Sequence, residues 1–266
     1  RSNMQNALRL FWSGTRVSFA VYSVELTPAV VLGSKIPRWV LQALFFVLIA
    51  KAAGGNELAK FALIGNAVHA AVFPAIVELA IVIEVEKWAG TLPHLIAAPA
   101  NWLPMMIGRS MAGFFDALLS TVLVLVVLVP VIAPDIAVVN LLRAAPLLVI
   151  TLVTTGGLGW LSGSISLPTR WGMLLCNMIG YIMMLTAAVN FPLSALPPAV
   201  QWLSRSLPMT HGLLAIRAVV DGAPYSDVTG LIGLEVLIGL VYGAAAWLMF
   251  RHRLNTARAN GNIELI

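Results

Sequence analysis

Six long apolar stretches constrain the fold of this chain more than any other feature. They cover residues 36–53, 58–83, 103–132, 138–164, 172–189 and 228–250. About 20 apolar residues in a helix cross the hydrocarbon core of a bilayer, which is about 30 Å thick. A helix also satisfies its own backbone hydrogen bonds where water is absent. The pattern therefore predicts an all-α polytopic membrane protein with six transmembrane helices.

Composition supports the same fold class. Hydrophobic residues make up 60% of the 266 positions and charged residues 10%, whereas soluble domains contain about 45–50% apolar and about 25% charged residues. Breakers such as Gly54-Gly55 and Pro168 separate the apolar stretches. No remaining segment is long enough for a soluble domain, so residues 1–266 are interpreted as one transmembrane domain.

The distribution of lysine and arginine predicts the orientation. Cytoplasmic flanks of membrane spans are enriched in these residues. If both termini are cytoplasmic, the outer side keeps only Lys51, Lys60, Arg143, Arg205 and Arg217. The net charge of +5 is then a signal of topology and of contact with anionic lipid headgroups. We do not expect nucleic acid as a partner.

The beginning of the chain has the pattern of a helix that lies on the membrane surface. Apolar and small side chains recur at three- and four-residue spacing, at Leu8, Phe11, Trp12, Thr15 and Phe19. Such an amphipathic stretch favours an interfacial helix within a cytoplasmic segment over residues 3–34. A short apolar signal peptide would look different. The alternative is an ordered N-terminal tail.

Residues 84–100, between the second and third stretches, are the part of the chain best suited to contact another protein. Gly90 supplies a hinge, Thr91 can cap a short helix, and Pro99 ends it. The candidate contact residues are Glu86, Gly90, Thr91, Leu92, His94, Leu95 and Pro99. A short helix with an exposed leucine edge is typical of a segment that docks into a groove.

This run resembles the signature Glu-Arg-x-x-Gly-Thr-Leu-x-x-Leu-x-x-x-Pro in the first cytoplasmic loop of the permease subunits of type-2 ATP-binding-cassette exporters. The matching positions are Glu86, Gly90, Thr91, Leu92, Leu95 and Pro99, whereas Lys87 replaces the usual arginine and Pro93 the usual polar residue. Three further segments, residues 37–46, 65–66 and 191–217, are similar to other patterns of the family. The family exports drugs, polyketides and polysaccharides.

The resemblance implies an assembly and a mechanism. Two permease copies, identical or related, would pair with two cytoplasmic ATPase subunits that dock on residues 84–100. ATP binding and hydrolysis would then drive alternating access and export of an amphipathic or hydrophobic cargo across a bacterial inner membrane. The chain contains no Gly-x-x-x-x-Gly-Lys-[Ser/Thr] phosphate loop, so we expect ATP and Mg²⁺ to bind to the partner subunit. We expect no cofactor and no metal in this chain.

The family's cargo path runs between the second and fifth spans of two permease copies. The candidate lining residues are Asn66, His69, Phe73, Val77, Asn177, Tyr181, Met184 and Asn190. Amide, aromatic and methionine side chains suit an amphipathic cargo. The sequence leaves open which of them face the cavity and which bond to a neighbouring helix.

Residues 190–222 are apolar but are interrupted by prolines, so a single straight helix is excluded. Two short re-entrant helices in the outer leaflet fit this pattern, and a surface loop is the alternative. The resemblance assigns an outer gate to Phe191, Pro192, Leu196 and Pro197.

Two acidic residues fall inside apolar stretches, where an unpaired charge is costly. Asp116 lies about two helical turns from Arg109, which favours a structural ion pair, and Glu235 lies in the last stretch. A structural role is favoured for both, with a functional role as the alternative.

Two other classes of protein were considered. An ion-coupled secondary transporter or a channel would show interrupted helices at matching places in two inverted halves, and residues 84–100 would have no role. An intramembrane enzyme would need a catalytic motif, yet His69, His94, His211 and His252 begin no His-Glu-x-x-His sequence. A transport subunit without catalytic residues is therefore predicted.

Overall fold

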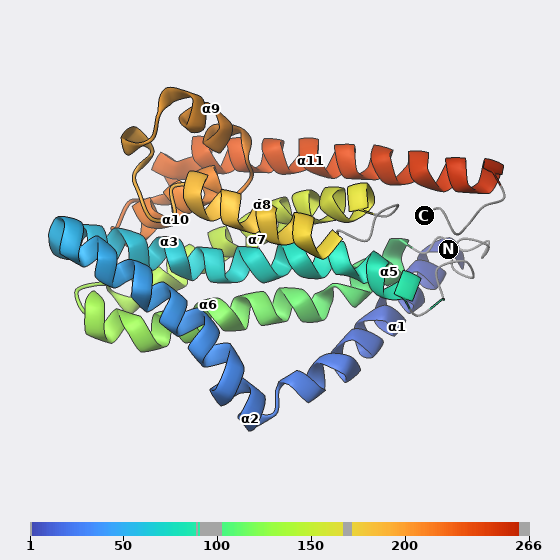
Figure 1. The fold of residues 1–266 in the computed structure, drawn as a ribbon, viewed down its shortest axis with the longest axis horizontal. Helices are drawn as coiled ribbons and strands as arrows, with labels where there is room; N and C mark the ends of the chain where they lie inside the picture. Colours follow the sequence, from blue (N-terminus) through green and yellow to red (C-terminus); the bar gives the residue numbers. More distant parts are fainter. Residues whose placement is uncertain (1, 89, 91–102, 167–171, 261–266) are drawn as a thin grey trace.

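The computed structural model describes residues 2–88, 90, 103–166 and 172–260, and all regular elements within these ranges are helices (Figure 1). The α-helices are α1 (Ser2–Glu25), α2 (Pro28–Val30), α3 (Gln42–Trp88), α5 (Leu103–Arg109), α6 (Met111–Ile132), α7 (Val138–Ser166), α8 (Gly172–Thr186), α9 (Pro198–Ser206), α10 (Thr210–Val220) and α11 (Tyr225–Asn260). Two π-helical segments, η1 (Val31–Lys35) and η2 (Pro37–Leu41), precede α3, and a 3₁₀ turn, η3 (Leu193–Ala195), precedes α9.

The described residues contain four helical segments that are long and apolar enough to cross a membrane. These are Pro28–Val82, Leu103–Ile132, Val138–Ser166 and Tyr225–Arg253. Two shorter apolar helices, Leu174–Thr186 and Thr210–Val220, accompany them. The described part of the chain is thus all-helical and polytopic, as predicted.

Helix α3 reverses direction within its length. Gly54 (φ −148°, ψ 20°) and Gly55 (φ 72°, ψ −157°) leave the helical conformation, and the positive φ of Gly55 costs glycine little. In Figure 1 the blue first arm, residues 42–53, reaches the left end of the molecule, and the cyan second arm, residues 56–88, returns beside it. The predicted break between the first two apolar stretches lies at this turn.

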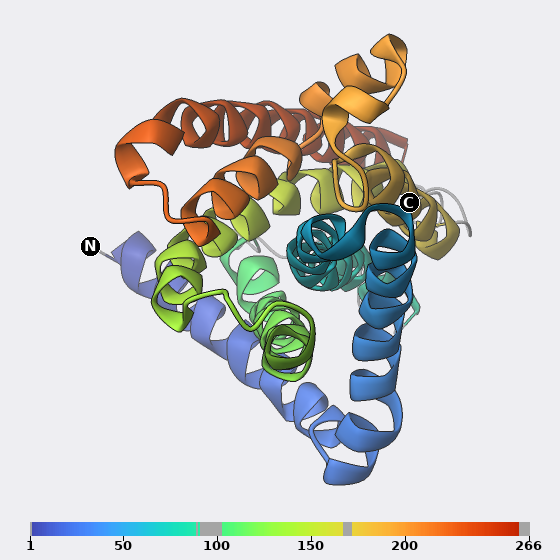
Figure 2. The same ribbon diagram turned by 90° about the vertical axis from the view of Figure 1, so that its left-hand side faces the viewer.

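The second arm of α3 lies at the centre of the bundle and packs against α6, α7 and α8, while α11 packs on α7 (Figure 2). Small residues allow close approach. A Cβ atom on Gly159 or Gly163 would meet the α3 backbone at Ile76 or Ala80. Apolar burial drives little helix association in lipid, so such close packing stabilises the bundle.

Several helix boundaries differ from those predicted. The stretch 103–132 is divided into α5 and α6 by a turn at Ser110, α7 extends to Ser166, and α11 covers 225–260. Helix α1 ends at Glu25, close to Pro28, because a residue before proline is disfavoured in the helical conformation. The break separates α1 from the first apolar stretch, so the segment predicted over 3–34 is not one continuous helix.

Helix α8 ends at Thr186, whereas the apolar stretch was predicted to continue as a helix to residue 189. The helix ends early because Arg217 binds backbone carbonyl groups of the residues after Thr186. The guanidinium of Arg217 donates to the carbonyl oxygens of Ala188 (2.7 Å) and Val189 (2.9 Å), and to that of Phe61 on α3 (2.9 Å). It also lies 3.4 Å from the centre of the Phe61 ring. One buried side chain from α10 thereby joins the end of α8 to α3.

Glu235 of α11 plays the corresponding role at the start of α10. Its carboxylate accepts hydrogen bonds from the backbone N–H groups of Met209 (2.7 Å) and Gly212 (2.9 Å) and from the hydroxyl of Thr154 (2.8 Å). The residue is fully buried. A carboxylate at a helix N-terminus is stabilised by otherwise unpaired N–H groups. The predicted structural role of this intramembrane acid is the one the contacts support.

Replacing Glu235 with alanine should therefore lower the free energy of unfolding by about 3 kcal/mol or more, because three buried donors lose their acceptor. Heating of the detergent-solubilised protein, followed by size-exclusion chromatography, measures this change. Glu57→Ala, at an exposed position of the α3 turn, is the control and should melt like the wild type. Equal melting of both variants would contradict the capping role.

Candidate functional site

Helix α1 lies along α5 and the first half of α6 in a regular register. Gly14 and Gly108 mark the crossing, since a Cβ atom on Gly14 would overlap the carbonyl oxygen of Met105, and one on Gly108 that of Phe11. One turn further on, the hydroxyl of Ser18 accepts a hydrogen bond from the N–H of Ala112 (3.2 Å). The two backbones are therefore in direct contact.

The register continues to a third pair, in which the hydroxyl of Tyr22 donates to the carboxylate of Asp116 (2.5 Å). Gly14, Ser18 and Tyr22 are spaced four residues apart, as are Gly108, Ala112 and Asp116 on the other segment. Residues at this spacing share one face of a helix, so the contact is a continuous stripe. We call the two packed segments, residues 2–25 and 103–116, the inner brace.

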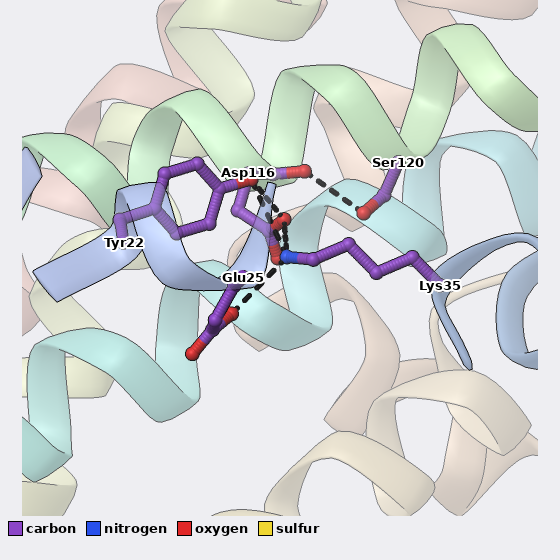
Figure 3. Close-up of polar contacts among 5 residues, drawn as sticks. All are labelled: Tyr22, Glu25, Lys35, Asp116 and Ser120. Carbon is purple, nitrogen blue, oxygen red and sulfur yellow. Dashed lines mark hydrogen bonds and ion pairs between the residues drawn. The ribbon is translucent and has the colours of Figure 1, made fainter. Parts of the chain in front are cut away.

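The brace ends in a charged cluster that also holds the start of the first apolar stretch (Figure 3). The ammonium group of Lys35 pairs with Asp116 and, at 3.2 Å, with Glu25. Lys35 also donates to the Tyr22 hydroxyl (3.3 Å). The side chains of Lys35 and Asp116 are only 10% and 16% exposed, whereas that of Glu25 is 57% exposed.

Each buried charge in the cluster has a close partner of opposite sign. Two buried charges are tolerated when each has a close partner and further hydrogen bonds. Burial and the adjacent Asp116 carboxylate raise the pKa of Tyr22 above its usual value, so the phenol stays protonated and remains a donor. The arrangement ties α1, η1 and α6 together at one point.

The partner of Asp116 differs from the predicted one. The predicted ion pair was with Arg109, two turns away on the same stretch, but the carboxylate pairs with Lys35 from η1. The sequence contained a signal for this pair, because an acid inside a span needs a counter-ion and Lys35 begins another apolar stretch. Tyr22, Gly14 and Gly108 carried no comparable signal.

A double-mutant cycle on the Lys35–Asp116 pair tests its role. Lys35→Met should lower the free energy of unfolding by about 3 kcal/mol, because it leaves the buried Asp116 carboxylate without its ion-pair partner. Asp116→Leu should lower it by less, because Lys35 keeps its contact with Glu25. The double variant should be close to the wild type, since neither charge remains. Thermal unfolding of all four proteins in nanodiscs is the measurement, and additive losses would exclude a direct pair.

The predicted cargo-path residues meet at the contact of the second arm of α3 with α8 and the segment after it. The side chain of Asn66 donates to that of Asn190 (2.8 Å), and the ring of His69 lies 3.2 Å from the carbonyl oxygen of Gly180. The rings of Phe73 and Tyr181 are 6.0 Å apart. Pairs far apart in the sequence thus lie side by side.

Burial divides this set. Asn66, His69, Phe73 and Asn190 are buried within the single chain, and Val77, Asn177 and Met184 are half-buried. Tyr181 is 55% exposed. The buried members hold α8 against α3. His69 is one of them, and its contact with Gly180 of α8 is the bond to a neighbouring helix that the sequence left open as an alternative. The side chain of Tyr181 lies on the surface of the chain.

The four predicted gate residues lie in the segment between α8 and α9. Phe191, Pro192 and Pro197 are exposed, and Leu196 is half-buried. Pro192 and Pro197 occupy the positions before η3 and α9, respectively, where a missing N–H group costs nothing. Trp202 of α9 is 74% exposed beyond them.

Most of the predicted partner-contact residues fall outside the described part of the chain. Thr91, Leu92, His94, Leu95 and Pro99 lie there. Glu86 belongs to the end of α3, and Gly90 is exposed with φ 68°, a conformation that glycine adopts readily. Helix α5 of the inner brace begins at Leu103, directly after this segment.

A separate apolar groove of about 500 Å³ lies between α3, α6, α7 and α11. Leu79, Phe114, Gly156, Trp160 and Gly239 are among its lining residues, which include none of the eight predicted path residues. Within the described ranges, no group of three or more His, Cys, Asp and Glu side chains is placed to hold a metal ion.

Comparison with known families identifies the class of the protein. Residues 19–220 match the family model described as ABC-2 type transporter, which is well over half of the chain. The chain therefore belongs to the ABC-2 type transporter family and is a membrane permease component of such a transporter. No curated protein matches the chain.

The family match confirms two predictions made from the sequence. The resemblance to type-2 ATP-binding-cassette permeases is correct, and so is the prediction of a multi-pass transport subunit in place of an intramembrane enzyme. The matched range begins within α1 and ends at the last residue of α10, so it includes the second segment of the brace, residues 103–116, and all of α8, α9 and α10.

Proposed function

We propose that this chain is the permease subunit of an ABC exporter, in which two permease copies and two separate ATPase subunits form an alternating-access pathway for an amphipathic or hydrophobic cargo. The observation that carries the proposal is the inner brace. Its second segment begins at Leu103, shortly after residues 84–100, which resemble an ATPase-docking loop, and it ends at the Lys35–Asp116 pair in the membrane domain.

Six spans fit this assembly. The α3 turn divides Pro28–Val82 into two antiparallel arms, and α8 supplies a further apolar helix between α7 and α11. Both termini and residues 84–100 then lie on one side, the cytoplasmic side, as the basic residues also favour. In Figure 1 the start of α1 and the end of α11 lie at the right-hand end, away from the α3 turn and α9.

The outer end of the bundle supports a re-entrant segment. Helices α9 and α10 are too short to cross a bilayer, and Arg217 and Glu235 satisfy backbone groups there that water would otherwise bind. Such pairing is what non-helical backbone at membrane depth requires. Phe191, Pro192, Leu196 and Pro197 are proposed as the outer gate of a bacterial inner-membrane exporter.

Force would travel along the brace. ATP-driven closure of the ATPase subunits displaces residues 84–100, and α5 moves with them because it follows without a break in the chain. Helix α1 must move with α5, since the backbones touch at Gly14 and Gly108. The Lys35 cluster then pulls the first arm of α3, and the α3–α8 contact with its proposed path residues opens or closes.

The docking role of residues 84–100 predicts the behaviour of Leu95→Asp. A charge at this position should abolish co-purification of the ATPase subunit, because an apolar docking edge cannot bury an unpaired carboxylate. Pull-down of the tagged permease with its co-expressed ATPase measures the association. Lys51→Gln, at an exposed position near the α3 turn, is the control and should retain the ATPase. Full association of Leu95→Asp would exclude this segment as the coupling contact.

The rigid brace makes a second prediction. A Ser18→Cys/Ala112→Cys pair, in a Cys176→Ala background that removes the chain's single cysteine, should form a disulfide across the brace. ATP-driven export should be within about twofold of the reduced protein, because two segments that move together lose no necessary motion. Uptake of a fluorescent amphiphile into inside-out vesicles measures export. Complete and reversible arrest by the disulfide would show that α1 and α6 move apart.

A further inference from the structure

Arg38 is a cationic side chain on a membrane-facing surface. Its guanidinium carbon lies 4.7 Å from the centre of the Trp39 ring and 5.8 Å from that of Phe73. Among the residues that the structure describes, no carboxylate pairs with it, whereas Lys35 and Lys60 both have acidic partners. Arg38 is also exposed. Stacking on rings leaves the N–H groups at the edge of a guanidinium open to a ligand.

The position of Arg38 in the first apolar stretch places it near the inner leaflet. It precedes the Gly54 turn by about 24 Å of helix at 1.5 Å per residue, in a bilayer core of about 30 Å. Phe73 lies at a similar distance on the other side of the turn. With the turn at the outer surface, as proposed, the guanidinium lies at the depth of the inner-leaflet headgroups and first methylene groups.

The guanidinium does not simply extend toward water, as arginine near a helix end commonly does. It lies against Phe73, which is buried between α3 and α8. Gly180 makes room for that ring, since a Cβ atom there would overlap it. The aromatic surface continues to the exposed ring of Tyr181.

Apolar side chains extend from this cation toward the outer side. Phe45 and Ile49 follow Arg38 on the same face of the first arm and are 59% and 47% exposed. On α8, Tyr181 and Leu185 are 55% and 59% exposed. Gln42 and Met184 are in contact (3.7 Å) and join the two helices. A cationic site that could hold a head group thus borders a long apolar surface.

We propose that Arg38 binds the phosphate group of an amphiphile whose hydrocarbon tail lies along the exposed side chains of the first arm and α8. Arginine binds phosphate through two parallel N–H bonds, and the Trp39 and Phe73 rings lie against one side of this guanidinium. The proposal rests on the exporter function proposed above and narrows its cargo to amphiphiles with a phosphate head. The same chemistry is present in a bilayer phospholipid and in a phosphorylated cargo.

Two probes with the same tail isolate the phosphate. Oleoyl lysophosphatidic acid and mono-oleoylglycerol are titrated against the purified full chain, together with its ATPase where it co-purifies, in phosphatidylcholine nanodiscs. The wild type should bind the phosphate probe about tenfold or more tightly, the effect of one charge-assisted hydrogen bond. Arg38→Gln should lose this preference and leave the affinity for mono-oleoylglycerol unchanged.

Matched variants separate the site from general electrostatics and from misfolding. Arg16→Gln removes an exposed arginine of α1 and should keep the preference. Arg38→Lys retains the charge and should reduce the preference, and it replaces Arg38→Gln if that variant does not elute as a single species. Equal binding of the two probes by the wild type, or equal losses in Arg16→Gln and Arg38→Gln, would overturn the proposal.

Nanodiscs enriched in phosphatidylglycerol distinguish the two sources of phosphate. If a bilayer lipid occupies the site, enrichment should abolish the preference for the phosphate probe in the wild type, and native mass spectrometry should detect phosphatidylglycerol retained by the wild type and not by Arg38→Gln. If the site selects a single-chain cargo, the preference should persist. Failure of the ATPase to co-purify would contradict the exporter assembly, but the preference could still be measured on the chain alone.

Discussion

Backbone polar groups inside a bilayer must be satisfied by the protein itself, and the packing of α8, α10 and α11 in this structure depends on that constraint. Helix α8 stops before the end of its apolar stretch, and α10 begins within the protein. Arg217 donates hydrogen bonds to the carbonyl groups left free at the end of α8. Glu235 accepts hydrogen bonds from the N–H groups left free at the start of α10. Both charged side chains are buried because their partners are backbone dipoles, which water cannot reach.

At the end of the brace, charged side chains pair with one another. Lys35, Asp116 and Glu25 come from three elements, and Tyr22 completes the cluster. The cluster stands where the surface helix meets the first apolar stretch, and backbone contact at Gly14 and Gly108 makes that helix part of the same rigid unit. In the proposed exporter, this unit would connect the cytoplasmic surface to the spans within a single chain.

Much of the fold could be predicted because membrane solvation imposes simple rules. Apolar length identified the helices, glycine pairs marked the α3 turn, and the Gly-Thr-Leu run indicated the family. Helix ends were harder to predict, because the end of α8 depends on Arg217, which lies about thirty residues further along the chain at a spacing that no local helical rule covers. Among the proposed path residues, the sequence left open which line a cavity and which bond to a neighbouring helix, and the contact of Asn66 with Asn190 depends on how α3 packs against the segment after α8.

The sequence by itself determined that the chain lies in a lipid bilayer, that its fold is all-helical and which family it belongs to, because each of these depends on local composition or on a contiguous motif. Tertiary structure alone decided the partners: Lys35 for Asp116, three buried donors for Glu235, and the rings beneath Arg38. These contacts join residues on separate helices, and their geometry depends on how the helices pack. Glycine positions and aromatic surfaces determine that packing, and no short-range pattern in the chain encodes it.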